Sequence, residues 1–196
     1  MTPTHGDNIC RGVGVVKRAT LVDNRAMSTL YRVDDRRLLA DLLGGANAFL
    51  GPAAVLAGLS AEQAHTKPHG LPHSIAELVA HMSYWQEWFN GCAAAGFTGI
   101  AEHAPEGWPA VPADGWGAVR ERYFAAIEEA KRIAATSESL GEAVLPPGVD
   151  IPPLAKESRG SGLLHAAMHS GHHLGQIVTI RQLLGLWPPA SGSMTW

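Results

Sequence analysis

A chain of 196 residues is long enough for one domain with a hydrophobic core and too short for two of ordinary size. Its hydrophobic content of 46% and charged content of 17% exclude a disordered chain, since such chains are poor in apolar residues. The formal net charge of -3 gives no indication of a nucleic-acid partner.

The start of the chain has neither a helical nor a strand-like period. Residues 1–26 contain a short basic stretch but no continuous apolar run with a small-residue cleavage site. Met27 opens a better-organised sequence. We therefore predict a flexible N-terminal extension over residues 1–33, one helical domain over residues 34–187 and a tail over residues 188–196.

The helical period begins at Asp34, where an aspartate can cap a helix and leucines recur at helical spacing. Gly44, Gly45, Gly51 and Pro52 interrupt this first segment. Because glycine and proline disfavour a helix interior, we expect a bend or a break there.

Three more helices follow. Ser74 and Glu77 form a capping box, in which each side chain can bind a backbone N–H at the start of a helix over residues 75–95. The other two are predicted over residues 116–137 and residues 158–186.

The connections between these helices are rich in glycine and proline and are expected at the surface; they span residues 60–73, 96–115 and 141–153. No segment alternates in the manner of a strand. Four helices around one core give an all-α fold, a four-helix bundle with long connections.

Ten histidines are an excess for a chain of this length. His169 and His173 are four residues apart, so their imidazoles lie on one helical face and can converge on a cation. His172 is rotated by roughly 100° from His173 and cannot easily share that cation. His81 lies inside the amphipathic second helix, where an unpaired imidazole would be costly to bury. Chance pairs do occur on surface helices, and a core histidine is more often satisfied by a hydrogen bond than by a metal.

Two stretches carry a family resemblance. The run SIAELVAHMSYW and the later run HSGHHLGQIVTIRQLLG closely resemble the DinB-like (DinB/YfiT) metal-binding family, and GLSAEQAHTKP resembles its connection between helices one and two. The resemblance covers about residues 34–186. It implies a four-helix bundle with His81, His169 and His173 as metal ligands.

The rest of the family motif is Gly175 and Gln176. A glycine within a helix costs about 1 kcal/mol relative to alanine, so we expect a neighbouring helix to approach closely at Gly175. Gln176 either supports a ligand from behind or is a solvated or packing glutamine.

Three neutral imidazoles would leave zinc or nickel with an open coordination position, which is the arrangement of catalytic sites. A water there becomes a nucleophile near neutral pH, and a thiol is deprotonated. The resemblance includes both metal-dependent hydrolases and S-transferases or isomerases that use low-molecular-weight thiols. The alternative is a metal-binding or stress-related interaction protein without turnover.

No general acid or base stands out. The weak candidates are His165, one turn before His169, Glu77, which also has the capping role, and Tyr123 in the third helix. Tyr84 and Trp85 are candidate walls of a pocket. The histidines of the first long connection are expected to be solvent-exposed; they are His65, His69 and His73.

Location and partners follow from simple features. No run of about 18 apolar residues indicates a membrane span, and Cys10 and Cys92 form neither a disulfide framework nor a metal or redox motif. We therefore expect a cytoplasmic protein with a small-molecule substrate and no membrane or nucleic-acid partner. Pairing among relatives implies a homodimer.

Overall fold

The computed structural model describes residues 35–45, 49–100, 104–152, 154–190 and 192. The predicted extension over residues 1–33 and most of the predicted tail lie outside these residues, so the domain boundaries stay predictions. Apart from one isolated bridge between Ala143 and Ser158, the described residues form helices and loops, as predicted. The elements are α2 (Asp35–Leu43), α3 (Pro52–Val55), α4 (Ala61–His65), α5 (Ile75–Ala95), the short 3-10 helix η1 (Ala104–Gly107), α6 (Trp116–Thr136) and α7 (Arg159–Leu183).

The predicted break in the first helix is confirmed. Helix α2 ends at Leu43, and Pro52 opens α3 at a position where its missing N–H is harmless. Gly45 has a φ of 81°, and a side chain there would overlap the backbone of Gly51. Two short helices thus replace one long one.

Capping boxes start the two helices that carry the candidate site. The hydroxyl of Ser74 accepts a hydrogen bond from the Glu77 N–H at 3.3 Å, and the Glu77 carboxylate accepts one from the Ser74 N–H at 2.7 Å. Ser158 and Ser161 make the equivalent pair at the start of α7. The predicted start of α5 is therefore confirmed.

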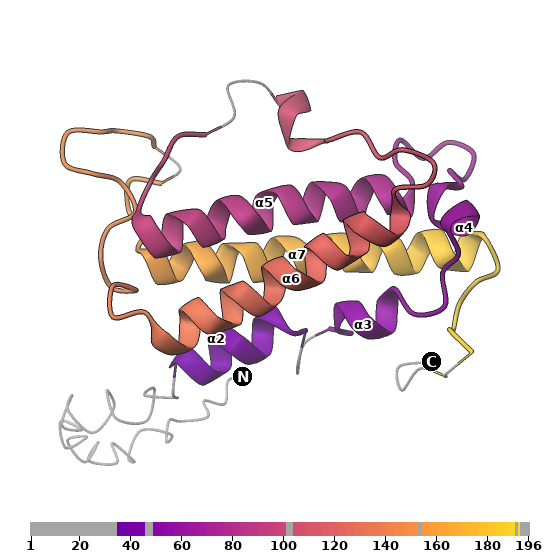
Figure 1. The fold of residues 1–196 in the computed structure, drawn as a ribbon, viewed down its shortest axis with the longest axis horizontal. Helices are drawn as coiled ribbons and strands as arrows, with labels where there is room; N and C mark the ends of the chain where they lie inside the picture. The colour runs from indigo at the N-terminus through magenta and orange to yellow at the C-terminus, as the bar shows by residue number, and fades with distance from the viewer. Residues whose placement is uncertain (1–34, 46–48, 101–103, 153, 191, 193–196) are drawn as a thin grey trace, which may run out of the picture. The chain divides into compact units, whose positions relative to one another are not determined.

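Helix α5 packs against both α6 and α7, and α2 packs against α6 and α7 from the other side (Figure 1). Contacts along the helices give their directions. Glu87 binds Arg122, and Asn90 donates to the Ala126 carbonyl, so α5 and α6 run in parallel. Arg159, at the start of α7, donates to the carbonyl of Ala94 near the end of α5, so these two helices are antiparallel.

The core is shared by these helices. One buried cluster joins α3, α5, α6 and α7, with Met82, Tyr123 and Ile177 among its members. A second joins α2, α6 and α7 around Leu43 and Leu163. Burying these faces fixes α5 against α7 and thereby fixes which residues of the two helices face each other.

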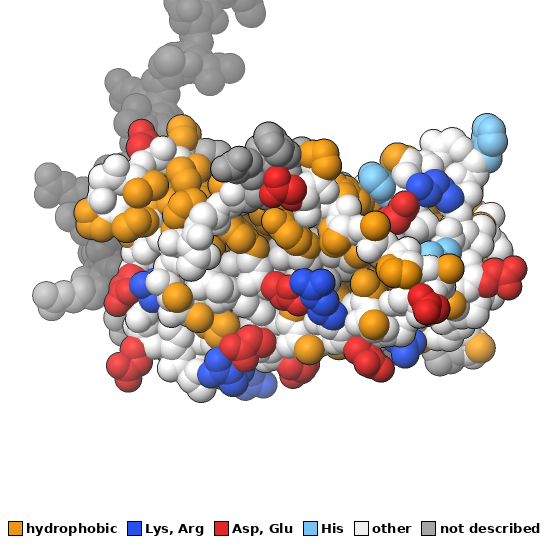
Figure 2. All heavy atoms as spheres, turned by 45° about the horizontal axis from the view of Figure 1, so that its top comes forward, with side chains coloured by type: hydrophobic (Ala, Val, Ile, Leu, Met, Phe, Trp, Pro, Cys, Tyr) orange, Lys and Arg blue, Asp and Glu red, His pale blue; other side chains and the backbone are white. Residues whose placement is uncertain are grey.

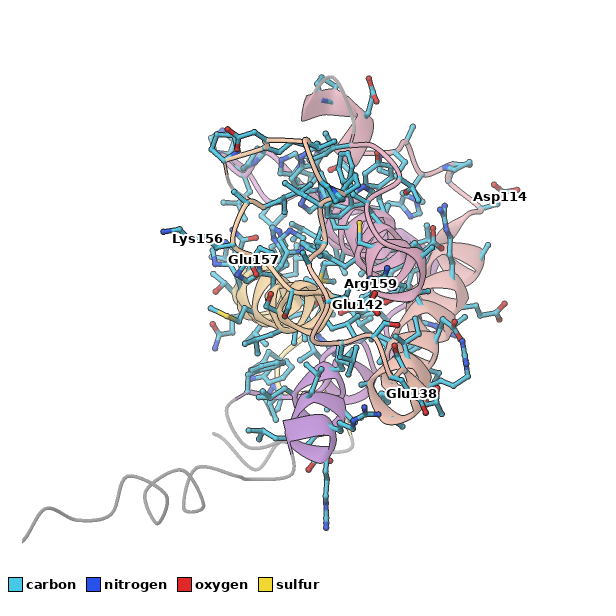
Figure 3. All side chains as sticks on the ribbon, turned by 90° about the vertical axis from the view of Figure 1, so that its left-hand side faces the viewer. Asp114, Glu138, Glu142, Lys156, Glu157 and Arg159 are labelled. Atoms are coloured by element: carbon cyan, nitrogen blue, oxygen red, sulfur yellow. The ribbon has the colours of Figure 1, made fainter. Side chains whose placement is uncertain are left out.

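The connection between α6 and α7 is held against the start of α7. The Val144 N–H donates to the Glu157 carbonyl at 2.9 Å, and Arg159 forms an ion pair of 3.1 Å with Glu142 (Figure 3).

Among the described helices, none is both long and apolar enough to cross a membrane. The cytoplasmic location stays a prediction.

Candidate metal centre

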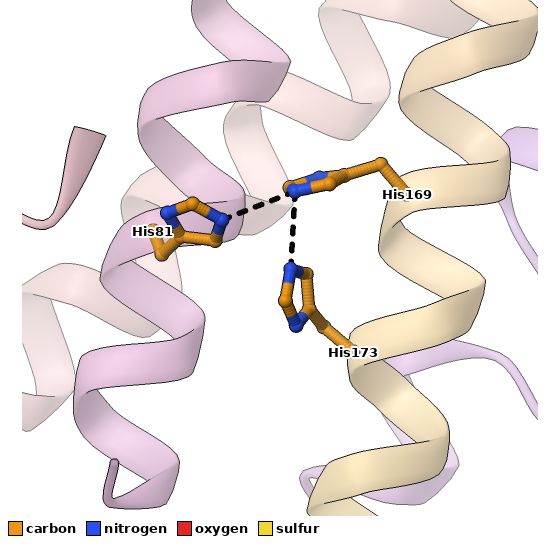
Figure 4. Close-up of side chains that lie close together, drawn as sticks. All are labelled: His81, His169 and His173. Atoms are coloured by element: carbon orange, nitrogen blue, oxygen red, sulfur yellow. Dashed lines mark hydrogen bonds between the residues drawn. The ribbon is translucent and has the colours of Figure 1, made fainter. Parts of the chain in front are cut away.

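Three histidines meet between α5 and α7 (Figure 4). His81 comes from α5, and His169 and His173 come from consecutive turns of α7. The Nε2 atom of His169 lies 3.1 Å from that of His81 and 3.0 Å from that of His173. Ligand nitrogens around a tetrahedral zinc ion are roughly 3.3 Å apart, so these two distances are close to the required spacing. All three ligand nitrogens lie within 4.8 Å of one another. Within the described part of the chain, this is the one group of three side chains placed to hold a metal ion.

The outer nitrogens of two of these rings fix where their protons lie. His81 Nδ1 is 2.6 Å from the Gly107 carbonyl oxygen, and His173 Nδ1 is 2.6 Å from Oε1 of Gln176. Because these oxygens only accept hydrogen bonds, each Nδ1 carries the proton and donates it. The Nε2 atoms of His81 and His173 are then unprotonated, and both lone pairs point at the centre of the trio.

Hydrogen bonds alone do not satisfy this centre well. His169 can offer one proton on Nε2, and that proton can be donated fully to only one of its two neighbours. The lone pair of the other neighbour is then left without a donor, and if His169 carries its proton on Nδ1 instead, all three lone pairs face one another. A divalent cation would accept all three, so this donor set fits a metal better than an internal hydrogen bond.

Burial keeps all three imidazoles neutral. It is the main cause that lowers the pKa of His81, although the hydrogen bond to Gly107 opposes it. Burial, together with the repulsion that protonated His173 and His81 would exert, lowers the pKa of His169 to about 3. Burial also lowers the pKa of His173, against the opposing effect of Gln176. Neutral imidazole is the form that binds metals.

The family model of the DinB superfamily matches residues 53–177, which include all three histidines. This chain belongs to the DinB superfamily. The match confirms the resemblance but covers less than the span of residues 34–186 that the sequence suggested. No curated protein and no solved structure matches the chain.

This DinB-superfamily protein surrounds His81 with aromatic rings. The indole of Trp108 stacks on His81 with a centroid distance of 3.8 Å and an interplanar angle of 12°. His73 stacks on the same indole at 3.8 Å and 10°. Two parallel imidazoles this close to one indole cannot share a face without overlapping, so they lie on its opposite faces.

The sequence analysis missed this part of the site. It expected His73 to be solvent-exposed and treated residues 96–115 as a surface loop, whereas His73 is half-buried in the stack and Gly107 is buried. No short pattern marks either residue. Their positions follow from the parallel order of α5 and α6, which requires a long connection back along α5 and which no local sequence pattern shows.

Of the three residues predicted to line or support the site, Trp85 and Gln176 contact its histidines, whereas Tyr84 contacts Trp85. Trp85 meets His81 edge-on at a centroid distance of 6.4 Å. Tyr84 packs edge-on against Trp85 at a centroid distance of 5.3 Å and, in the described chain, has no ring contact with the trio. Gln176 holds His173, which is the supporting role that the sequence left open.

The weak catalytic candidates do not join the trio. Glu77 caps α5 and pairs with Lys67 at 3.0 Å, and its pKa is lowered by the hydrogen bonds from Ser74 and Lys67 despite burial. His165 has a side chain that is 46% exposed, and its Nε2 lies 3.7 Å from a Glu157 oxygen. Tyr123 is 0% exposed in the core, and burial raises its pKa to about 12. Among the described residues, no hydrogen bond or ring contact links any of the three to the trio.

The expectation for Gly175 is wrong. Gly175 is exposed, and a side chain there would meet nothing within 4 Å. The close approach is one turn earlier, at Gly171, where an added Cβ would lie 3.0 Å from the ring of Phe49. The helix alone could not show which of its glycines faces a neighbour.

Proposed function

We propose that this protein binds a divalent metal ion, zinc or nickel, through the Nε2 atoms of His81, His169 and His173. The observation that carries this proposal is the pair of outer hydrogen bonds, to Gly107 and Gln176, which aims two lone pairs at one point. When bound, such an ion would supply a Lewis-acidic centre with an open position, able to lower the pKa of a water or a thiol. The fold around it is a four-helix bundle in which α2 and α3 together take the place of the first helix.

The trio offers no negative charge to a cation. The two acidic residues on α5 are engaged elsewhere, Glu77 with Lys67 and Glu87 with Arg122. Three neutral imidazoles therefore favour an anionic fourth ligand, such as hydroxide or thiolate. This supports an enzyme that activates water or a low-molecular-weight thiol, hence a hydrolase or an S-transferase.

A small cavity lined by Gln176, the residue that binds His173, supports a small-molecule substrate. It has a volume of about 160 Å³, and its lining includes His73, Leu78, Gln176 and Ile180. Gln176 therefore touches both the cavity and His173. A larger cavity of about 520 Å³ lies between α2 and the start of α7, and its described lining contains no histidine, so we assign the function to the smaller one.

One observation favours the alternative, a metal-binding protein without turnover. None of the candidate acid–base residues contacts the trio in the described chain, and His165, our candidate for proton transfer, is separated from His169 by a full turn.

We propose homodimer formation on the strength of the exposed apolar residues of α7, Leu164, Met168 and Leu183.

Turnover assays distinguish these functions. We would load the protein with zinc or nickel, then measure consumption of bacillithiol, mycothiol or glutathione on an electrophilic bimane, and hydrolysis of an activated ester. Metal-dependent thiol consumption that is lost in His173→Ala supports a transferase, and metal-dependent ester hydrolysis supports a hydrolase. If the metal-loaded protein neither consumes a thiol nor hydrolyses the ester, the proposal of an enzyme is contradicted. The alternative, a metal-binding protein without turnover, then stands.

A further inference from the structure

The connection between α5 and α6 crosses the candidate metal centre because of the bundle's topology. Helix α5 has 21 residues and is therefore about 30 Å long. Since α6 runs parallel to it, the chain has to return along this whole length before α6 can begin. Figure 1 shows η1 on this return path, over the middle of α5. Figure 2, turned toward this face, shows hydrophobic side chains covering much of it, with charged side chains gathered mostly lower down.

We propose that Trp108 is a positioning residue of the metal centre, which fixes the ring of His81 and is itself backed by His73. This inference rests on the proposed metal binding. The contacts are the stack of Trp108 on His81, the stack of His73 on Trp108, and the hydrogen bond from His81 to the carbonyl of the preceding residue, Gly107.

Two of these contacts together set the direction of the His81 lone pair. The side-chain torsion next to a histidine ring is broad, so the ring needs outside support to hold one orientation. The stack with Trp108 fixes the plane of the ring, and the hydrogen bond to Gly107 fixes its rotation within that plane. Nε2 then points at His169 and His173.

Gly107 allows the segment to come this close. An added Cβ would lie 3.0 Å from Nε1 of Trp85 and 3.2 Å from two further atoms of that indole. Because Trp85 meets His81 edge-on, the space beside the Gly107 carbonyl is already filled. The segment from Gly107 to Trp108 is thus fitted between one tryptophan and the ligand.

Metal affinity and the placement of this segment are therefore linked. A cation on Nε2 makes the Nδ1–H of His81 a stronger donor to the Gly107 carbonyl. By reciprocity, any change that loosens the segment weakens metal binding. His73 contributes through its face, so a phenyl ring in its place should serve, whereas a methyl group should not.

The test is zinc affinity, measured by competition with a chromophoric chelator on the full chain. Trp108→Ala should weaken binding about tenfold, as the loss of other supporting groups does, and Trp108→Phe should restore most of it. Trp88→Ala is the matched control, because Trp88 donates to the Gly99 carbonyl of the same connection and has no ring contact with the trio. Similarly, His73→Ala should weaken binding and His73→Phe should not, with exposed His69→Ala as the control.

Thermal unfolding of the metal-free variants separates positioning from general stability. Trp108→Ala should change affinity by more than Trp88→Ala even if both lower the melting temperature equally. If Trp108→Ala does not fold, nickel quenching of tryptophan fluorescence decides instead. The fraction of fluorescence that nickel quenches should fall most in Trp108→Phe and should change little in Trp88→Phe.

The outcomes separate the two proposals. Wild-type protein that binds no zinc overturns the proposed function together with this inference. Two results would overturn only the role of Trp108 while the wild type binds zinc. In the first, Trp108→Ala binds zinc as tightly as the wild type does. In the second, Trp88→Ala binds zinc as weakly as Trp108→Ala does. Nickel quenching of tryptophan fluorescence that is the same in Trp108→Phe as in the wild type would also overturn the role of Trp108.

Discussion

His173 donates its Nδ1 proton to Oε1 of Gln176, three residues further along α7, at a distance of 2.6 Å. One helix thus supplies both a candidate ligand and the group that orients it. The spacing matters because residues three apart lie on neighbouring positions of a helix surface.

Replacing Gln176 should weaken metal binding without unfolding the protein. In Gln176→Ala, His173 loses its Nδ1 acceptor and with it the fixed tautomer, and we expect zinc affinity to fall about 10- to 100-fold. Chelator competition measures this. Gln182→Ala, at an exposed position near the end of the same helix, should bind zinc like the wild type. Equal affinities of the two variants would remove the role given to Gln176.

Two glycines of helix α7, Gly171 and Gly175, should respond differently to alanine. Gly175→Ala fills open space in a helix interior and should raise the free energy of unfolding by up to about 1 kcal/mol. Gly171→Ala gains the same helix propensity but meets the Phe49 ring at 3.0 Å, so it should be the less stable of the two. Urea unfolding of the metal-free variants gives the order. A more stable Gly171→Ala would show that Phe49 does not hold its place against α7.

The stability of the metal-free protein should fall with acid. The pKa of His169 is about 3 in the folded chain against 6.5 as its ordinary value, so below pH 6.5 the unfolded chain binds more protons than the folded one. This contribution to stability is complete above pH 6.5 and is lost progressively as the pH falls toward 3.

The slope can be assigned with a variant. We would measure urea unfolding from about pH 7 to about pH 4 for the wild type and for His169→Asn, which has no titrating ring. The slope should be smaller in the variant, by at most about 1.4 kcal/mol per pH unit for one proton. Parallel curves would mean that His169 is not buried neutral.

Arg181 is a structural residue in the described fold. Its side chain is 3% exposed, and its guanidinium donates to the carbonyl of Val55 at 2.6 Å and to that of Leu186 at 3.1 Å. Arg181→Met should leave both carbonyls unpaired and lower the free energy of unfolding by roughly 1–3 kcal/mol. Arg132→Ala, which removes an exposed pair with Glu129, should change it far less, because water screens an exposed pair. Equal effects would contradict the buried role of Arg181.

Much of the fold could be predicted because its signals are local. The start and end of α5 follow from the box at Ser74 and the glycine at position 96, and the observed span of Ile75–Ala95 equals the predicted one. Helix α7 ends at Leu183, three residues before the predicted end. The local signal is Gly185, whose φ of 69° lets its own N–H and that of Leu186 donate to the carbonyls of Gln182 and Arg181.

The trio was found from spacing and resemblance, but its surroundings were not. That α5 and α6 run in parallel depends on contacts between distant residues, such as Asn90 with the Ala126 carbonyl, which no local period encodes. The positions of Gly107 and Trp108 over His81 follow from that topology. The error at Gly175 has the same origin, because only the packed structure shows which face of α7 meets Phe49.

The central claim is that His81, His169 and His173 hold one metal ion. The most direct measurement is elemental analysis of protein purified without a histidine tag, for the wild type, His169→Ala and the exposed neighbour His172→Ala. We expect stoichiometric zinc or nickel in the wild type and in His172→Ala, and its loss in His169→Ala. Stoichiometric metal in His169→Ala, or none in wild-type protein exposed to excess zinc, would contradict the claim.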